Sequence, residues 1–165
     1  MFDSTYNASP RSMKEAINTV FTIRSQLFPN SEIWLILGDM RELGSLTELE
    51  HRSLAGYVSQ VADKVFLLGT SMHTYLADEL EKINFDQRKL TLANGLNDLN
   101  RQVEIALRKA KQPSPLLLFK GSQNTIFLEE SVKHFLLHSS DEKLLTRQGT
   151  FWEEKRKAFF DEGST

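Results

Sequence analysis

The sequence has no cysteine among its 165 residues. Disulfide bonds, thiolate catalysis and zinc–thiolate sites are therefore excluded, because each of them requires a cysteine sulfur. Lysine and arginine together number 20 and aspartate and glutamate 22, which gives a net charge of -2. Binding to nucleic acid or to an anionic membrane surface usually needs a basic footprint, which this composition does not provide. We expect neither partner.

Long apolar runs are absent as well. No stretch approaches the roughly 20 apolar residues that cross a bilayer as a helix, and no signal-peptide pattern opens the chain. The length suits one domain with a sizeable core. We expect a soluble, monomeric protein of the cytoplasm.

The sequence also lacks the glycine-rich motifs with which many proteins bind nucleotide phosphates. Neither G-x-x-x-x-G-K-[ST] nor G-x-G-x-x-G occurs in the chain. The first of these motifs, the P-loop, cradles the β- and γ-phosphates of ATP. Without it, the chain is expected to hold no complete catalytic site and to hydrolyse no ATP on its own.

The chain does contain a clear pattern of buried strands, each followed by polar residues. The strongest is the apolar run Ile33–Leu37, which Gly38 ends. Unbroken apolar runs of this kind are typical of strands buried on both faces of a parallel sheet. Further strands are predicted at Val65–Leu68 and Leu116–Phe119, with a weaker one at Lys89–Ala93. Residues 2–10 look like the end of a strand that enters a helix.

Amphipathic helices are predicted between these strands. Apolar residues recur at helical spacing within residues 13–27, 54–61, 71–82, 99–110 and 125–137. Ser9 and Pro10 suit an N-cap and a first helical position, and Ser45 with Glu48 has the spacing of a capping box. The alternation of strands and helices predicts an α/β fold, a doubly wound, mostly parallel, Rossmann-like sheet with helices on both faces.

A polar stretch at 139–142 separates the predicted α/β domain, residues 1–138, from the segment 139–165. Phe151, Trp152, Phe159 and Phe160 flank a charged run in that segment, which predicts an amphipathic terminal helix. Two interpretations remain open. The helix packs back on the same domain, which we expect, or its aromatic face binds a partner.

Polar residues at the strand ends are candidates for ligand binding, because open α/β sheets bind ligands outside the carboxyl ends of their strands. Asp39 and Glu42 could coordinate an ion or accept hydrogen bonds from an amine, or they could cap the next turn. Lys120, Gly121 and Ser122 could place an ammonium group and backbone N–H groups beside an anion. An ordinary solvated lysine is the commoner case at a strand end.

The histidines carry weaker signals. His51 follows the Asp39 turn and could point back towards it, although a histidine that simply has partners in the core or at the surface is the commoner case. His134 and His138 are four residues apart on one helical face. Neither a third ligand nor an H-E-x-x-H pattern accompanies them, so we expect no metal site.

Three segments together resemble the C-terminal domain of the Mur ligases. They are Asp3–Pro10 with Ser12–Met13, Leu37–Gly44 with His51, and Lys120–Gln123 with Leu128–Glu129, in the family's order across residues 2–137. The resemblance is to the branch of the family that joins D-alanyl-D-alanine to UDP-N-acetylmuramoyl tripeptide, a peptidoglycan precursor. It implies an ATP-dependent reaction in which a carboxylate is phosphorylated and an amine attacks the acyl phosphate.

The resemblance also implies that N-terminal and central domains outside this sequence bind the UDP-sugar, ATP and Mg²⁺. This chain would then be the domain that closes over the nucleotide and presents the amine. Asp3, Tyr6 and Asn7 would face the nucleotide, whereas Asp39, Glu42, His51, Lys120, Gly121 and Ser122 would line the substrate side. The family often has an acid where Ser4 stands and an arginine where Gln123 stands. The alternative is a free-standing α/β module that binds a small molecule or a partner without catalysis.

Overall fold

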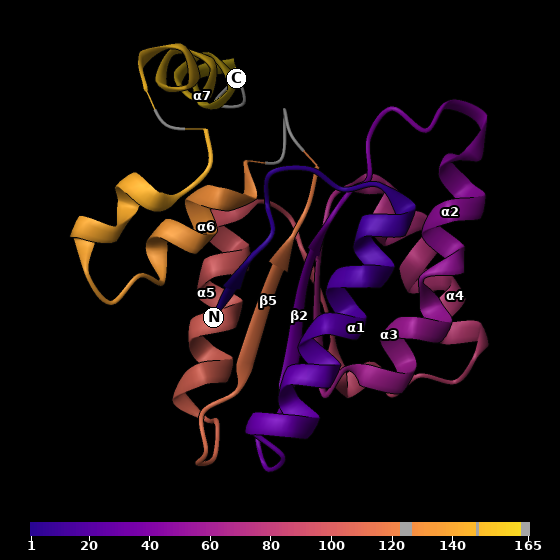
Figure 1. The fold of residues 1–165 in the computed structure, drawn as a ribbon. Helices are drawn as coiled ribbons and strands as arrows, with labels where there is room; N and C mark the ends of the chain where they lie inside the picture. Colours follow the sequence, from indigo (N-terminus) through magenta and orange to yellow (C-terminus); the bar gives the residue numbers. More distant parts are fainter. Residues whose placement is uncertain (123–126, 148, 163–165) are drawn as a thin grey trace.

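The computed structural model describes residues 1–122, 127–147 and 149–162. Its centre is a five-stranded sheet in the order β1-β5-β2-β3-β4, in which every neighbouring pair is parallel (Figure 1). The strands are β1 (Phe2–Asp3), β2 (Ile33–Gly38), β3 (Lys64–Leu68), β4 (Leu90–Ala93) and β5 (Leu116–Lys120). The predicted parallel α/β sheet is confirmed.

Helices cover both faces of this sheet (Figure 1). One face carries α1 (Pro10–Leu27), α3 (Ala55–Val61), the π-helical turn η2 (Met72–Ala77) and α4 (Asp78–Lys82), with α2 (Thr47–Ser53) beside them. The other carries α5 (Leu96–Arg108) and α6 (Leu128–His134). Short 3₁₀ turns lie at η1 (Gly44–Leu46), η3 (Gln87–Lys89) and η4 (Ser139–Leu144), and α7 (Thr150–Glu162) is the last helix.

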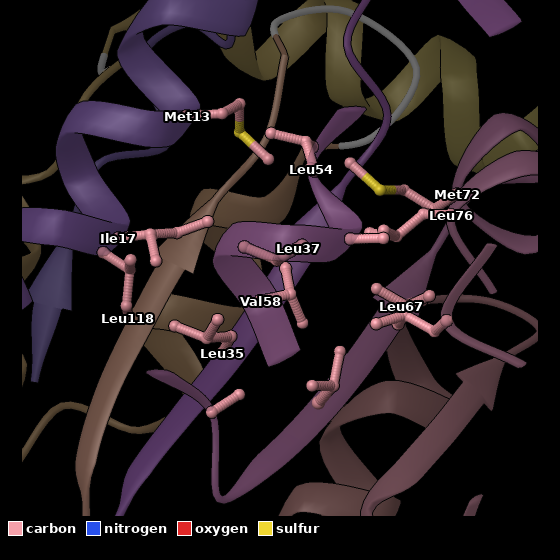
Figure 2. Packing of buried hydrophobic residues seen from close by; sticks show 14 of the residues in the cluster. Met13, Ile17, Leu35, Leu37, Leu54, Val58, Leu67, Met72, Leu76 and Leu118 are labelled. Atoms are coloured by element: carbon pink, nitrogen blue, oxygen red, sulfur yellow. The ribbon is translucent and has the colours of Figure 1, made fainter. Parts of the chain in front are cut away.

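The core has two halves, because successive side chains of a strand point to opposite faces of the sheet. In β2, Leu35 and Leu37 pack with Val58 of α3 on one face (Figure 2). Trp34 and Ile36 pack on the other face, against α5 and α6. All six residues of β2 are buried. Since burying one such large apolar side chain is worth about 1.5–3 kcal/mol, this strand anchors the domain.

The connections leave the sheet in two directions. The helices that follow β1, β2 and β3 pack on the α1 face, whereas α5 and α6, which follow β4 and β5, pack on the opposite face. The chain therefore reverses where β5 lies between β1 and β2. Such a reversal is the position at which doubly wound sheets bind ligands, outside the carboxyl ends of the strands.

Two helix starts differ in how they are capped. Ser9 is the N-cap of α1 as predicted, and it forms a capping box with Ser12. The box predicted at Ser45 and Glu48 is wrong, because η1 occupies that stretch and α2 starts without a side-chain cap hydrogen bond. Glu48 instead accepts a hydrogen bond of 2.8 Å from Arg52, one helical turn further on.

The boundaries of later helices also differ from the prediction. The single helix predicted from the Ser45 capping box through the apolar stripe at 54–61 is divided in two, because a break at Leu54 separates α2 from α3. Helix α6 ends at His134, not near 137, and the Leu137 side chain is almost fully exposed. Residues 125 and 126, where this helix was predicted to start, lie outside the described residues.

The terminal helix α7 lies at the end of the molecule towards which β5 points (Figure 1). Phe151 is exposed and Trp152 half-buried. The side chains of Phe159 and Phe160 lie outside the described residues. Within the described chain, no helix is both long and apolar enough to cross a membrane.

Candidate functional site

The turns after β2 and β5 are joined at the carboxyl edge of the sheet. The Ser122 N–H donates to the Asp39 carbonyl at 3.1 Å, and the Arg41 N–H donates to Ser122 Oγ at 3.2 Å. Between them, a Cβ on Gly121 would lie 3.3 Å from Gly38 Cα. Glycine at 121 therefore allows the two turns to approach closely.

Asp39 supports the fold from within this edge. Its buried carboxylate accepts hydrogen bonds from the N–H groups of Ser71 at 3.2 Å and Met72 at 2.8 Å, at the start of η2. Gly69 has a φ of +110°, and a Cβ there would lie only 2.4 Å from Asp39 Cγ. Of the two roles considered for Asp39, these contacts support capping of the next turn; its contact with a ligand stays a prediction.

His51 is fully buried and points back towards the turn after β2. Its Nε2 lies 3.1 Å from the Met40 nitrogen, and its Nδ1 lies 2.7 Å from the Thr47 carbonyl oxygen. Because the Met40 N–H can only donate, these partners assign Nε2 as the acceptor and Nδ1–H as the donor. A neutral imidazole therefore ties the turn to α2.

The loop after β1 turns its polar side chains outward. Asp3, Tyr6 and Asn7 are exposed, Tyr6 to 67%, whereas Thr5 and Ala8 are buried. Asp3 Oδ1 accepts hydrogen bonds from the Thr5 N–H at 2.9 Å and from Thr5 Oγ1 at 2.7 Å. The three side chains that the resemblance assigns to the nucleotide are thus accessible on a locally braced loop.

Lys120 extends beneath that loop. Its side chain is only 3% exposed, and its Nζ donates to the carbonyl oxygens of Ser4 at 3.2 Å and Asn7 at 2.5 Å. Desolvation lowers the pKa of the ammonium group, and the nearby Asp3 carboxylate partly offsets this shift. The interpretation of Lys120 as a solvated lysine is therefore wrong. Its contact with a substrate carboxylate stays a prediction.

The structure adds two charged residues to the site: Arg147, which the sequence-based interpretation missed, and Glu129, which that interpretation included in a motif without giving it a role. Arg147 Nη1 binds Glu129 Oε2 at 2.5 Å, and both side chains are buried. Arg147 Nη2 donates to the carbonyl oxygens of Thr5 and Tyr6, at 2.7 and 2.5 Å. Arg147 follows a polar segment and belongs to none of the recognised motifs, so nothing in its local sequence pointed to this contact.

The remaining candidates take no part in the contacts described above. Glu42 is exposed and has a positive φ of 62°. His134 Nε2 lies 2.6 Å from Glu104 Oε1, and no group of three potential metal ligands occurs within the described residues. An open hollow of about 370 Å³ lies between β1 and α1, with Asp3 and Ser4 in its wall.

A parallel α/β domain with polar turns gathered at the reversal of its sheet belongs to the class of ligand-binding doubly wound domains. Comparison with known families makes this specific. The model of the family "Mur ligase, glutamate ligase domain" matches residues 2–123. The chain belongs to the Mur ligase family.

The relatives agree on one branch of this family. The UDP-N-acetylmuramoyl-tripeptide–D-alanyl-D-alanine ligase of Bacillus subtilis (strain 168) is 31% identical over 137 residues, which are 82% of this chain and 28% of that protein. The chain thus spans little more than a quarter of the length of this relative.

Solved structures show the same domain. Two crystal structures of MurF from Acinetobacter baumannii match with TM-scores of 0.63 and 0.60, at 24% and 27% identity, over 80% of this chain and 26% and 27% of those chains. MurF ligase from Thermotoga maritima, solved in complex with ADP, matches with a TM-score of 0.53 at 18% identity, over 86% of this chain and 28% of that chain.

Proposed function

We propose that this chain is the C-terminal domain of an ATP-dependent ligase that joins D-alanyl-D-alanine to UDP-N-acetylmuramoyl tripeptide. The main observation behind this proposal is the 31% identity to the Bacillus subtilis UDP-N-acetylmuramoyl-tripeptide–D-alanyl-D-alanine ligase. The geometry supports the same proposal, because the three segments with Mur ligase character end at one edge of the sheet. N-terminal and central domains would complete the enzyme.

The nucleotide side of the proposed site is the loop after β1. Its support comes from the exposed side chains of Asp3, Tyr6 and Asn7 above a backbone that is bound from beneath. ATP with Mg²⁺ would supply the phosphoryl group that activates the acceptor carboxylate. Since the chain has no P-loop, its own residues would orient the nucleotide and exclude water, and the central domain would hold the phosphates and the metal ion.

The substrate side is the joined pair of turns after β2 and β5. Glu42 is exposed there and could attract the amine of the dipeptide, while Gly121 and Ser122 bring the two turns together. Asp39 and His51 would act from beneath, by fixing the shape of the turn. We expect Lys120 to act on both sides. Its ammonium group has three donors, and two of them bond to the loop after β1.

The test uses the longer polypeptide that carries this chain at its C-terminal end. ADP release is measured with the UDP-linked tripeptide and with D-alanyl-D-alanine, D-glutamate or L-alanine as the amine. We expect turnover only with D-alanyl-D-alanine, and none from a polypeptide that lacks these 165 residues. Turnover with D-glutamate instead, or turnover that persists without this chain, would overturn the proposal.

A further inference from the structure

Two buried cations bind four consecutive carbonyl groups in the loop after β1. Lys120 Nζ donates to the first and last carbonyl oxygens of residues 4–7, at 3.2 and 2.5 Å. Arg147 Nη2 donates to the two between them, at 2.7 and 2.5 Å. All four carbonyl groups of this loop therefore face a cation inside the protein.

Arg147 reaches this loop from a segment 140 residues further along the chain. It is 6% exposed, has a positive φ of 57°, and pairs through Nη1 with the fully buried carboxylate of Glu129. A buried ion pair contributes little net stability, because desolvation offsets most of its attraction. The structural effect of this ion pair is to fix the orientation of the Arg147 guanidinium group, so that Nη2 points at the loop.

The terminal helix reinforces this arrangement. Arg156 Nη1 donates to the Arg147 carbonyl at 2.9 Å, and Arg156 Nε pairs with Glu130 at 3.1 Å. The guanidinium carbon of Arg147 lies 5.7 Å from the centre of the Trp152 ring. Helix α7 thus holds the main chain at Arg147, whereas only the Arg147 side chain, among these groups, bonds to the loop.

We propose that Arg147 is a positioning residue for the nucleotide, and that residues 139–162 are therefore part of the nucleotide side of the site. This inference rests on the proposed function. With their carbonyl oxygens bound inside, residues 4–7 present the exposed side chains of Tyr6 and Asn7 to the ligand. Released carbonyl groups would turn partial negative charge towards the phosphates of ATP, which would weaken binding.

The variants separate positioning from folding. Arg147→Ala would leave the Glu129 carboxylate buried without its partner, a change that costs several kcal/mol in other proteins. The main variant is therefore Arg147→Met combined with Glu129→Gln, which removes both charges and keeps most of the volume. Arg147→Lys restores a cation with fewer donors, and Arg101→Ala is the matched control, because it removes an exposed arginine of α5 that pairs with Asp98 outside the proposed site.

The experiment measures equilibrium binding of ATP to the complete ligase polypeptide, the KM for D-alanyl-D-alanine, and amide hydrogen exchange without nucleotide. For the double variant we expect ATP affinity to fall about tenfold or more, the dipeptide KM to stay within about twofold, and exchange in residues 4–8 to accelerate at an unchanged melting temperature. Arg147→Lys should recover part of the affinity, and Arg101→Ala should retain all of it.

Three results would overturn the inference. ATP affinity could stay unchanged although exchange in the loop accelerates, the dipeptide KM alone could rise, or Arg101→Ala could weaken ATP binding as much as the double variant. The proposed function fails by a different result, namely a wild-type polypeptide without turnover on D-alanyl-D-alanine. Because ATP binding is measured directly, the role of Arg147 is decided in that case too.

Discussion

Buried polar side chains at the strand ends bond mainly to the main chain of neighbouring turns. Asp39 accepts from two N–H groups, His51 joins the turn after β2 to α2, and Lys120 donates to two carbonyl groups. Each of these side chains satisfies backbone groups that would otherwise be costly to bury. The residues that were natural ligand candidates in the sequence therefore shape the surface on which, in the proposed function, exposed residues would contact the ligand.

Two kinetic outcomes are considered for a substitution of Lys120, and they differ in which of the two substrates binds more weakly. Its contacts with the loop after β1 predict that Lys120→Met in the complete ligase weakens ATP binding about tenfold, because a hydrogen bond to a charged group is worth about 1.5–3 kcal/mol. The resemblance implies a rise in the KM for D-alanyl-D-alanine instead. Measurement of both constants decides. Lys111→Met, at an exposed position before β5, is the control.

Gly69 is the most sterically restricted glycine of the site. Gly69→Ala should lower the free energy of unfolding by about 2 kcal/mol or more, because its φ of +110° is strained for alanine and the added Cβ would lie 2.4 Å from Asp39 Cγ. Urea denaturation measures the loss. Gly56→Ala, in α3 with no atom within 4 Å of the added Cβ, should be neutral or slightly stabilising. Equal effects at both positions would contradict this reading of the turn.

At the scale of elements, the sequence predicted the parts that follow from local pattern. The apolar runs that became β2, β3 and β5 could be recognised because strands buried on both faces have no polar alternation. The start of α1 could be recognised from Ser9 and Pro10. The capping box at Ser45 failed because the 3₁₀ turn η1 occupies that stretch, and Glu48 pairs with Arg52 instead. The i,i+4 spacing of this pair can be seen in the sequence, but the ion pairs that also join Arg52 to α4 cannot.

The C-terminal segment is expected to stabilise the domain mainly through Arg147 and less through helix α7. Deletion of 147–165 should cost about 3–5 kcal/mol, because it leaves the Glu129 carboxylate buried without Arg147. Deletion of only 150–165 should cost about 2 kcal/mol or less, since Phe151 is exposed and Trp152 half-buried. Thermal and urea unfolding compare the two.

A second change identifies the cause of the larger loss. Glu129→Gln should recover part of the stability lost in the 147–165 deletion, because a neutral amide is less costly to bury than an unpaired carboxylate. If the two deletions cost the same and Glu129→Gln recovers nothing, exposure of apolar surface on α7 would be the main cause. That outcome would support the expectation from the sequence, in which the aromatic residues of the terminal helix stabilise the domain by packing on it.

At the scale of the whole molecule, the site depends on contacts that no window of sequence contains. The place of β5 between β1 and β2 brings Lys120 under residues 4–7, and η4 returns the chain so that Arg147 meets the same loop. The resemblance to the Mur ligases located the loop, the turn after β2 and the turn after β5. It gave no role to Arg147, because that residue acts through a sequence separation of 142 positions from Thr5.

This division of labour predicts that the 165-residue chain alone hydrolyses no ATP. Its residues brace the loop after β1, which we propose faces the nucleotide, but the sequence has no P-loop to cradle the β- and γ-phosphates. The chain is incubated with ATP, Mg²⁺, the UDP-linked tripeptide and D-alanyl-D-alanine, and phosphate release is measured before and after a second purification. Asn7→Ala, at an exposed position of the loop, is assayed beside it. Release that survives repurification and disappears in Asn7→Ala would show that the chain carries a complete site, and the need for a central domain would then be refuted.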